Sequence, residues 1–173
     1  ATTAPFVLLL NSDAALDADA LAALWRCMET HPRCAAVGCA VRRPDGTPQT
    51  TARRFLTVVN QAAELLLGPT RLLGGRFART ARVLPGPDGV DESVDWIEGS
   101  CLLLRRSALD EVGLFDERFF MYGEDEDLCR RLRRAGYAIA FTSGGEARHV
   151  GGASAAREPD AMLREHAASQ MKL

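Results

Sequence analysis

The chain has 173 residues, of which 47% are hydrophobic and 25% charged, and its formal net charge is -2. This length and composition are typical of one globular domain with a sizeable core. Because the chain has no basic excess, a nucleic-acid partner is not expected. No apolar run reaches the ~20 residues of a membrane-spanning helix, and the first residues do not resemble a secretion signal.

The cysteines predict neither a disulfide framework nor a zinc site, because they are odd in number and no two have Cys-x-x-Cys spacing. They are expected to be small core residues, and a reducing cytoplasm is the simplest compartment. The five residues are Cys27, Cys34, Cys39, Cys101 and Cys129.

The first half of the chain predicts two strands around one helix. Residues 6–10 form a continuous apolar run, typical of a strand buried on both faces. Residues 35–41 predict a second strand, and residues 44–47 predict a hairpin turn after it. Residues 50–91, interrupted by glycines and prolines, predict a variable loop region. The helix between the two strands is expected to bury four residues with the spacing of one helical face: Leu21, Leu24, Trp25 and Met28.

The second half alternates strands and helices, which predicts an α/β fold. Residues 96–104 are strand-like, and Gly99 within them would permit a bulge or the close approach of a ligand. A short helix is expected over residues 107–112 and a longer one over residues 124–135. Residues 137–141 predict a last strand, and the glycines that follow it are expected to be flexible.

Two acidic positions are candidates for chemistry. Asp13 follows the first predicted strand, where open α/β sheets bind ligands, and its carboxylate could hold a divalent cation or could simply close a turn. Residues 124–127 are four consecutive carboxylates at a helix start. The helix dipole favours acids there, but four in a row repel one another, and crowding can raise the pKa of one towards that of a general base.

Two further positions carry a histidine and a tryptophan. His149 lies among glycines, which indicates backbone near a ligand, although a lone histidine is often structural. An imidazole together with a carboxylate and phosphate oxygens suits manganese or a similar ion. Trp96 stands beside Glu98 and Gly99 and could stack on the apolar face of a sugar, or could be a core residue.

Longer segments resemble a known family. Residues 95–106 and residues 112–137, with Gly-Glu-Asp-Glu-Asp-Leu inside the second, are similar to family 2 glycosyltransferases and most of all to their rhamnosyltransferase-like branch. Residues 8–14 resemble that family's metal-binding strand end, with a serine in place of the usual proline. Residues 149–154 resemble its late histidine motif.

This resemblance implies a GT-A-like mixed sheet flanked by helices and assigns roles by position. Asp13 and His149 would bind a divalent metal, Mn²⁺ or Mg²⁺, with Asn11 as a further contact to metal or donor. Asp125 would be the base that deprotonates the acceptor hydroxyl. The other implied substrate-binding residues are Trp96, Glu98, Gly99, Ser100 and Glu124.

The implied activity is inverting transfer of a sugar from a nucleotide-diphosphate donor, either dTDP-rhamnose or a UDP-sugar. The acceptor would be a hydroxyl of a glycan or polyprenyl-linked molecule in bacterial cell-wall or polysaccharide biosynthesis. Such a protein is expected in the cytoplasm, including peripheral sites at the inner face of the membrane. The oligomeric state is not specified by the sequence.

The family normally begins with nucleotide-binding βα units, and none precedes the first strand of this sequence. Residues 1–173 are therefore expected to be one domain, the N-terminally truncated catalytic portion of such an enzyme, with weak activity on its own. Two alternatives stay open: a nucleotidyltransferase of related fold, and a non-catalytic sugar-binding module.

Overall fold

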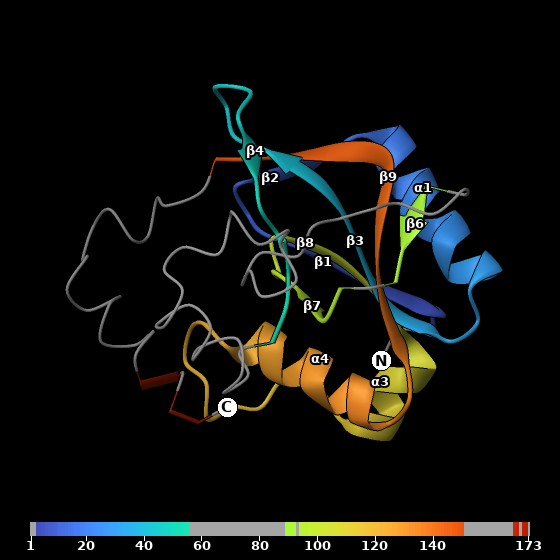
Figure 1. Cartoon of the computed structure of the whole chain (residues 1–173), viewed down its shortest axis with the longest axis vertical. Coiled ribbons are helices and arrows are strands. Elements are labelled where there is room, and N and C mark those ends of the chain that lie inside the picture. The colour runs from blue at the N-terminus through green and yellow to red at the C-terminus, as the bar shows by residue number, and fades with distance from the viewer. Residues whose placement is uncertain (1–2, 56–88, 93, 151–167, 170, 173) are drawn as a thin grey trace, which may run out of the picture.

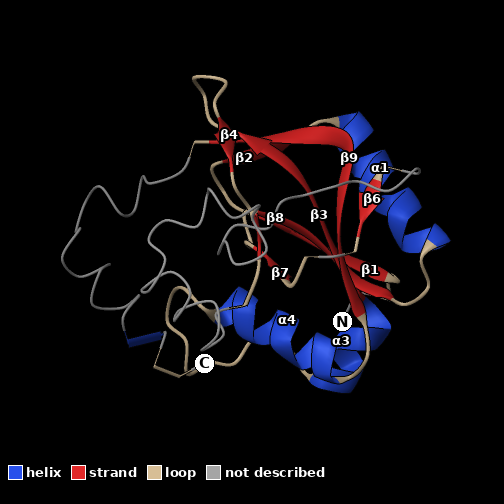
Figure 2. Cartoon of the chain, viewed as in Figure 1, coloured by secondary structure: helices blue, strands red, loops and turns tan. Residues whose placement is uncertain are grey.

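In a computed structural model, residues 3–55, 89–92, 94–150, 168–169 and 171–172 are described. Within them, a mixed sheet is packed with helices, and a two-stranded sheet lies beside it (Figure 1, Figure 2). The strands are β1 (Phe6–Leu10), β2 (Ala14–Leu16), β3 (Cys34–Arg42), β4 (Pro48–Gln49), β5 (Ala52–Arg53), β6 (Val90–Asp91), β7 (Trp96–Ile97), β8 (Cys101–Arg105) and β9 (Ala138–His149). The helices are α1 (Ala18–Thr30), α3 (Arg106–Val112) and α4 (Glu124–Arg134).

The strand order of the large sheet combines both pairing modes. It runs β1-β8-β3-β9-β2, with β4 paired to β3 and β6 to β9. Strands β3 and β9 are parallel, and the other neighbours are antiparallel. A parallel pair needs a long crossover connection, and the chain between β3 and β9 includes α3 and α4. The predicted α/β class with a mixed, helix-flanked sheet is therefore confirmed.

Alternate residues of the central strands divide the core into two clusters. On β8, Leu102 and Leu104 pack in a cluster with residues of α3 and α4, whereas Cys101 and Leu103 pack in a cluster with residues of α1. This alternation is expected of a strand that is buried on both faces. In Figure 2, α3 and α4 accordingly lie together and away from α1.

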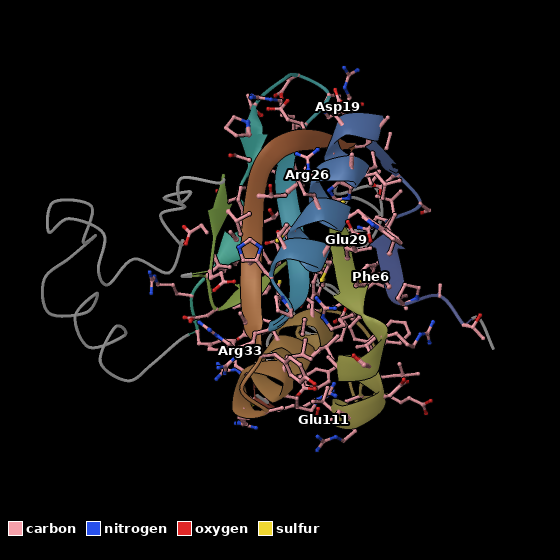
Figure 3. The ribbon with its side chains drawn as sticks, turned by 90° about the vertical axis from the view of Figure 1, so that its right-hand side faces the viewer. Phe6, Asp19, Arg26, Glu29, Arg33 and Glu111 are labelled. Atoms are coloured by element: carbon pink, nitrogen blue, oxygen red, sulfur yellow. The ribbon has the colours of Figure 1, made fainter. Side chains whose placement is uncertain are left out.

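The edge strand β1 is less buried than its apolar sequence predicted. It forms one end of the strand order and pairs with β8. Phe6 meets Trp25 of α1 edge-on, with ring centroids 4.9 Å apart, and Figure 3 shows Phe6 beside that helix. Further along the strand, Leu8 and Leu10 are exposed. The prediction that both faces of this strand are buried is therefore wrong for the part of the chain that is described.

The buried face of α1 also differs from the prediction, because Leu21 and Trp25 are exposed. The reason lies in β9: a Cβ atom built on Gly145 would lie 2.3 Å from the Cα of Ala20. The helix and the strand thus approach so closely that only small side chains fit between them. The large side chains of Leu21 and Trp25 lie outside this contact. The residues that α1 buries are Ala20, Ala23, Leu24, Cys27 and Met28.

Strand β9 continues through Gly144 and Gly145, two of the glycines that were expected to be flexible; the other two, at positions 151 and 152, lie outside the described residues. Cys39 and Ala40, which are consecutive on β3, pair with Thr142 and Glu146, so residues 143–145 bulge out of the ladder. A bulge bends a strand and changes the direction of the residues after it. The end of β9 is thereby brought alongside β2.

The strand predicted over residues 96–104 is interrupted by a turn at Glu98–Ser100, between β7 and β8. Strand β7 pairs with β5, whereas β8 pairs with β1 and β3. The chain therefore changes sheets at this turn, which we call the strand break.

The expectation of a variable loop region over residues 50–91 lies mostly outside the described residues. At the ends of that region, β5 and β6 are short strands paired with β7 and β9. Within the described residues, no helix is long and apolar enough to cross a lipid bilayer.

The contact between α1 and β9 makes a stability prediction. Gly145→Ala should lower the free energy of unfolding by about 1–3 kcal/mol, and Tm by a few degrees, because the added methyl group meets backbone atoms. Gly99→Ala is the control, since its nearest contact would be 3.9 Å away. An unchanged Tm for Gly145→Ala in thermal denaturation would contradict the packing described here.

Candidate active site

The strand break holds the side chain of Asp125. The backbone N–H of Gly99 donates to Asp125 Oδ2 at 3.0 Å, and the N–H of Glu126 donates to Oδ1 at 2.8 Å. Both carboxylate oxygens are therefore held in place by main-chain donors, one from the break and one from the first turn of α4. A carboxylate fixed in this way has a defined orientation relative to a molecule that binds beside it.

The start of α4 is shaped by the two residues before it. Tyr122 has φ 64° and Gly123 has φ 93°, both in the left-handed region. Backbone strain of this kind in a non-glycine residue persists only where the surroundings enforce it, and it is frequent at functional sites. A Cβ on Gly123 would lie 3.3 Å from the Phe119 ring, so a glycine suits this position for steric as well as conformational reasons. This turn directs the first helical carboxylates towards the strand break.

Burial raises the pKa of Asp125 to about 6. The two main-chain hydrogen bonds lower the pKa, whereas the negative charges of Glu124 and Glu98 raise it. Desolvation is the largest of these effects and disfavours the charged form. The result is a carboxylate that is mostly ionised at neutral pH and still basic enough to accept a proton.

A second group of polar side chains lies where β2 meets β9. Ala14 pairs with His149 in the antiparallel ladder, so the preceding Asp13 is brought beside the imidazole. His149 Nε2 lies 3.1 Å from Asp13 Oδ1 and 3.2 Å from Asn11 Nδ2. The sequence-predicted metal residues are therefore in contact, although His149 is 138 positions from Asn11 in the chain.

These residues have the chemistry to hold a divalent metal. A carboxylate oxygen only accepts hydrogen bonds, whereas an imidazole nitrogen either carries a proton or offers a lone pair, so their close approach is favourable when a proton or a cation lies between them. Within the described residues, no third His, Cys, Asp or Glu joins them. Mn²⁺ and Mg²⁺ are commonly bound by one or two protein ligands together with phosphate oxygens and water, and the pair fits such an ion.

The two groups are connected through consecutive residues of the strand break. The N–H of Asn11 donates to the carbonyl of Ser100 at 3.2 Å, and the N–H of Gly99 binds Asp125. The pair Asp13–His149 and the carboxylate of Asp125 are therefore built around the same turn. The sequence-based expectation that positions 13, 125 and 149 converge around one cation stays a prediction.

Glu98 and Trp96 were expected to bind substrate, and the structure gives both of them partners within the protein. Arg53 forms an ion pair with Glu98, with Nε 2.7 Å from Oε1, and its guanidinium carbon lies 5.7 Å from the centre of the Trp96 ring. Gln49 donates from Nε2 to Glu98 Oε2 at 3.3 Å. Substrate roles for Glu98 and Trp96 stay predictions.

Three polar atoms around the strand break are buried without a hydrogen-bond partner among the described residues: Thr51 Oγ1, Ser100 Oγ and Glu124 Oε2. Buried polar atoms without partners are rare in folded proteins and are often satisfied by a ligand or a water molecule. Ser100 and Glu124 were predicted to bind substrate, and their unpartnered atoms favour that role.

Sequence analysis missed Gln49, Thr51 and Arg53. Gln49 follows the predicted hairpin turn, and the other two belong to a segment that was expected to be a loop. No local sequence pattern identifies these residues, because their contacts arise from the pairing of β5 with β7 and from the hydrogen bond between Gln49 and His149 at the end of β9. The sequence signal that could have indicated them is a polar residue in a short segment that pairs with another strand.

The mixed, helix-flanked sheet has a GT-A-like α/β architecture. The model of the glycosyltransferase-like family 2 matches residues 1–171. The chain therefore belongs to glycosyltransferase family 2, as the resemblance of its motifs predicted.

Curated relatives agree with this assignment. The chain is 35% identical over 163 residues to an N-acetylglucosaminyl-diphospho-decaprenol L-rhamnosyltransferase of Mycobacterium tuberculosis, which covers 93% of the chain and 52% of that protein. It is 31% identical to the O-antigen biosynthesis protein RfbC of Myxococcus xanthus, over 76% of the chain and 10% of that protein. It is 44% identical to the rhamnosyltransferase WbbL of Escherichia coli K12, over 34% of the chain and 22% of that protein. The chain thus spans about half the length, or less, of these relatives.

The environment of Asp125 predicts its titration. In a pH series of carboxyl ¹³C NMR spectra, Asp125 should titrate at about pH 6, whereas the pKa of exposed Asp45 is lowered by hydrogen bonds from Thr47. Because the folded state holds this proton above the ordinary aspartate range, Asp125 should also make folding progressively less favourable as pH rises from about 4 to 6. Titration of Asp125 at or below pH 4 would contradict the burial described here.

Proposed function

We propose that the protein is an inverting, metal-dependent glycosyltransferase that transfers a sugar from a nucleotide-diphosphate donor to an acceptor hydroxyl. One observation carries the proposal: Asn11 and Asp125 bind the main chain of consecutive residues, Ser100 and Gly99. The segment with the candidate cation ligands and the candidate base are thereby both bonded to one turn. Such an arrangement suits a reaction in which one group leaves as another attacks.

The cation site would use Asp13 and His149 as protein ligands, with Asn11 beside them. A divalent metal bound there would offset the negative charge of the donor diphosphate. Asp13 contributes the negative charge and His149 a neutral nitrogen, which leaves coordination positions for phosphate oxygens. The N–H of Val150 donates to the carbonyl of Asp13 at 3.1 Å and keeps the two residues together.

Asp125 would act as the base. Its carboxylate accepts the proton of the acceptor hydroxyl while that oxygen forms a bond to the anomeric carbon and the bond to the diphosphate breaks. The raised pKa of Asp125 supports this role, because a base is most effective when its pKa lies near the working pH. A single displacement of this kind inverts the anomeric carbon and needs no covalent enzyme intermediate.

Glu124 and Ser100 would orient the substrates. Both contribute buried polar atoms without partners among the described residues. Ser100 follows Gly99, whose N–H binds Asp125, and Glu124 directly precedes Asp125. Hydrogen bonds to sugar hydroxyls would satisfy these atoms and would position the attacking oxygen.

The substrate class follows from the relatives. Two of them are named rhamnosyltransferases, and one is named for an N-acetylglucosaminyl-diphospho-decaprenol acceptor. We therefore favour a nucleotide-activated rhamnose as donor, with a UDP-sugar as the alternative, and a polyprenyl-linked glycan as acceptor. An acceptor of that kind would place the protein at a membrane surface.

Asp125→Asn tests the base. In the complete protein, the variant should lower kcat by about 10²–10⁴-fold while the Kd for the donor stays within a few-fold, because the amide keeps the size of the side chain but cannot take the proton. The wild-type kcat should also fall as pH decreases through about 6.

Asp110→Asn makes the same chemical change on the exposed side of α3 and is the control for that experiment. It should leave both kcat and the Kd for the donor unchanged. Turnover of Asp125→Asn near the wild-type rate would overturn the assignment of Asp125.

Asp13→Asn tests the cation site. A thermal-shift screen of sugar nucleotides should find one that stabilises the wild-type protein only when Mn²⁺ is present, since a ligand that binds the folded state raises Tm. The variant should lose that metal-dependent increment, because it removes the only negative ligand of the pair. Equal stabilisation of both proteins would reject Asp13 as a metal ligand.

A further inference from the structure

The imidazole of His149 has a second contact, on the side away from Asp13. Its Nδ1 lies 3.0 Å from Oε1 of Gln49. The amide nitrogen of Gln49 in turn lies 3.3 Å from Oε2 of Glu98. A chain of three side chains thus runs from the strand break to the candidate metal ligand.

The direction of these hydrogen bonds follows from Glu98. An ionised carboxylate can only accept, so the Gln49 group that faces it must be the amide N–H. The carbonyl oxygen of Gln49 must then face His149, and it can only accept. Nδ1 of His149 therefore carries a proton. Nε2 lies between an acceptor, Asp13 Oδ1, and the amide nitrogen of Asn11, which donates, so once Nδ1 is protonated Nε2 is the nitrogen whose lone pair can meet a cation.

Glu98 is well fixed for this task. Arg53 binds it with a two-nitrogen ion pair, and the N–H of Glu98 donates to the carbonyl of Thr51 at 2.9 Å. The carboxylate is partly buried and forms its ion pair with the nearby guanidinium. The pairing of β5 with β7 holds Arg53 and Glu98 on neighbouring strands.

We propose that Gln49, held by Glu98, is a positioning residue that keeps His149 in the Nδ1–H tautomer and so directs Nε2 towards the cation. This inference rests on the proposed function, because it assigns a purpose to Nε2 only if a cation binds beside Asp13. It gives Glu98 a role within the protein in place of direct contact with substrate. A metal-binding histidine commonly donates its other N–H to such a partner, and loss of that partner typically costs 10–100-fold in metal affinity.

The first experiment is imidazole ¹⁵N NMR of the 173-residue chain without metal. The wild-type spectrum should show His149 with a proton on Nδ1. Gln49→Leu, which keeps the approximate size of the side chain but removes both hydrogen bonds, should shift His149 towards the Nε2–H form. Thr50→Val alters an exposed neighbour and should leave the tautomer unchanged.

A double variant separates positioning from simple structural damage. Gln49→Glu with Glu98→Gln exchanges the amide and the carboxylate, so position 49 still accepts from His149 while position 98 donates to it. The Nδ1–H tautomer should return. If Gln49 served only to fill space, the double variant would behave no differently from Gln49→Leu.

The second measurement is Mn²⁺ affinity by EPR on the same proteins. Gln49→Leu should weaken binding about 10–100-fold, and the double variant should restore it to within a few-fold of wild type. An Nε2–H tautomer in the wild type, or an unchanged tautomer and Mn²⁺ affinity in Gln49→Leu, would overturn the inference while leaving the proposed function intact. If the tautomer depends on Gln49 but the wild type does not bind Mn²⁺, the tautomer assignment stands and the proposed metal site fails.

Discussion

Where β2 meets β9, an oxygen of Asp13 and a nitrogen of His149 lie 3.1 Å apart. The contact is favourable when a proton or a cation lies between the two atoms, so the fold has to bring together two groups that are distant in the sequence. It does so through the ladder between the two strands and through the bulge at residues 143–145, which redirects the end of β9. The tight contact of Gly145 with α1 fixes that bulge in place.

The strand break at Glu98–Ser100 is the second constraint. At this turn the N–H of Gly99 donates to Asp125 and the carbonyl of Ser100 accepts from Asn11. One short turn therefore contacts both parts of the proposed site, the base and the segment of the cation ligands. Burying the carboxylate of Asp125 raises its pKa and disfavours its charged form. The buried Asp125 carboxylate therefore lowers the stability of the folded state at neutral pH. The same burial makes it better suited to accept a proton.

Much of this arrangement was predictable from the sequence. Asp13 and Asp125 were located because each follows a recognisable local signal, a strand end and an acidic helix start, and the family motifs supported both. The face of α1 was mispredicted because a helical pattern shows which residues are apolar but not how closely β9 approaches. Gln49 and Arg53 were missed for a related reason: their roles depend on pairing between segments about 45–100 positions apart, which no local pattern contains.

The most direct test of the account is a Mn²⁺ titration followed by NMR of the chain, since the paramagnetic ion broadens the signals of nuclei close to it. The account predicts that signals of Asn11, Asp13 and His149 broaden first, while those of His31, at the end of α1, stay sharp. It would be contradicted if Mn²⁺ broadened the signals of exposed acidic residues across the surface and left those of His149 unaffected.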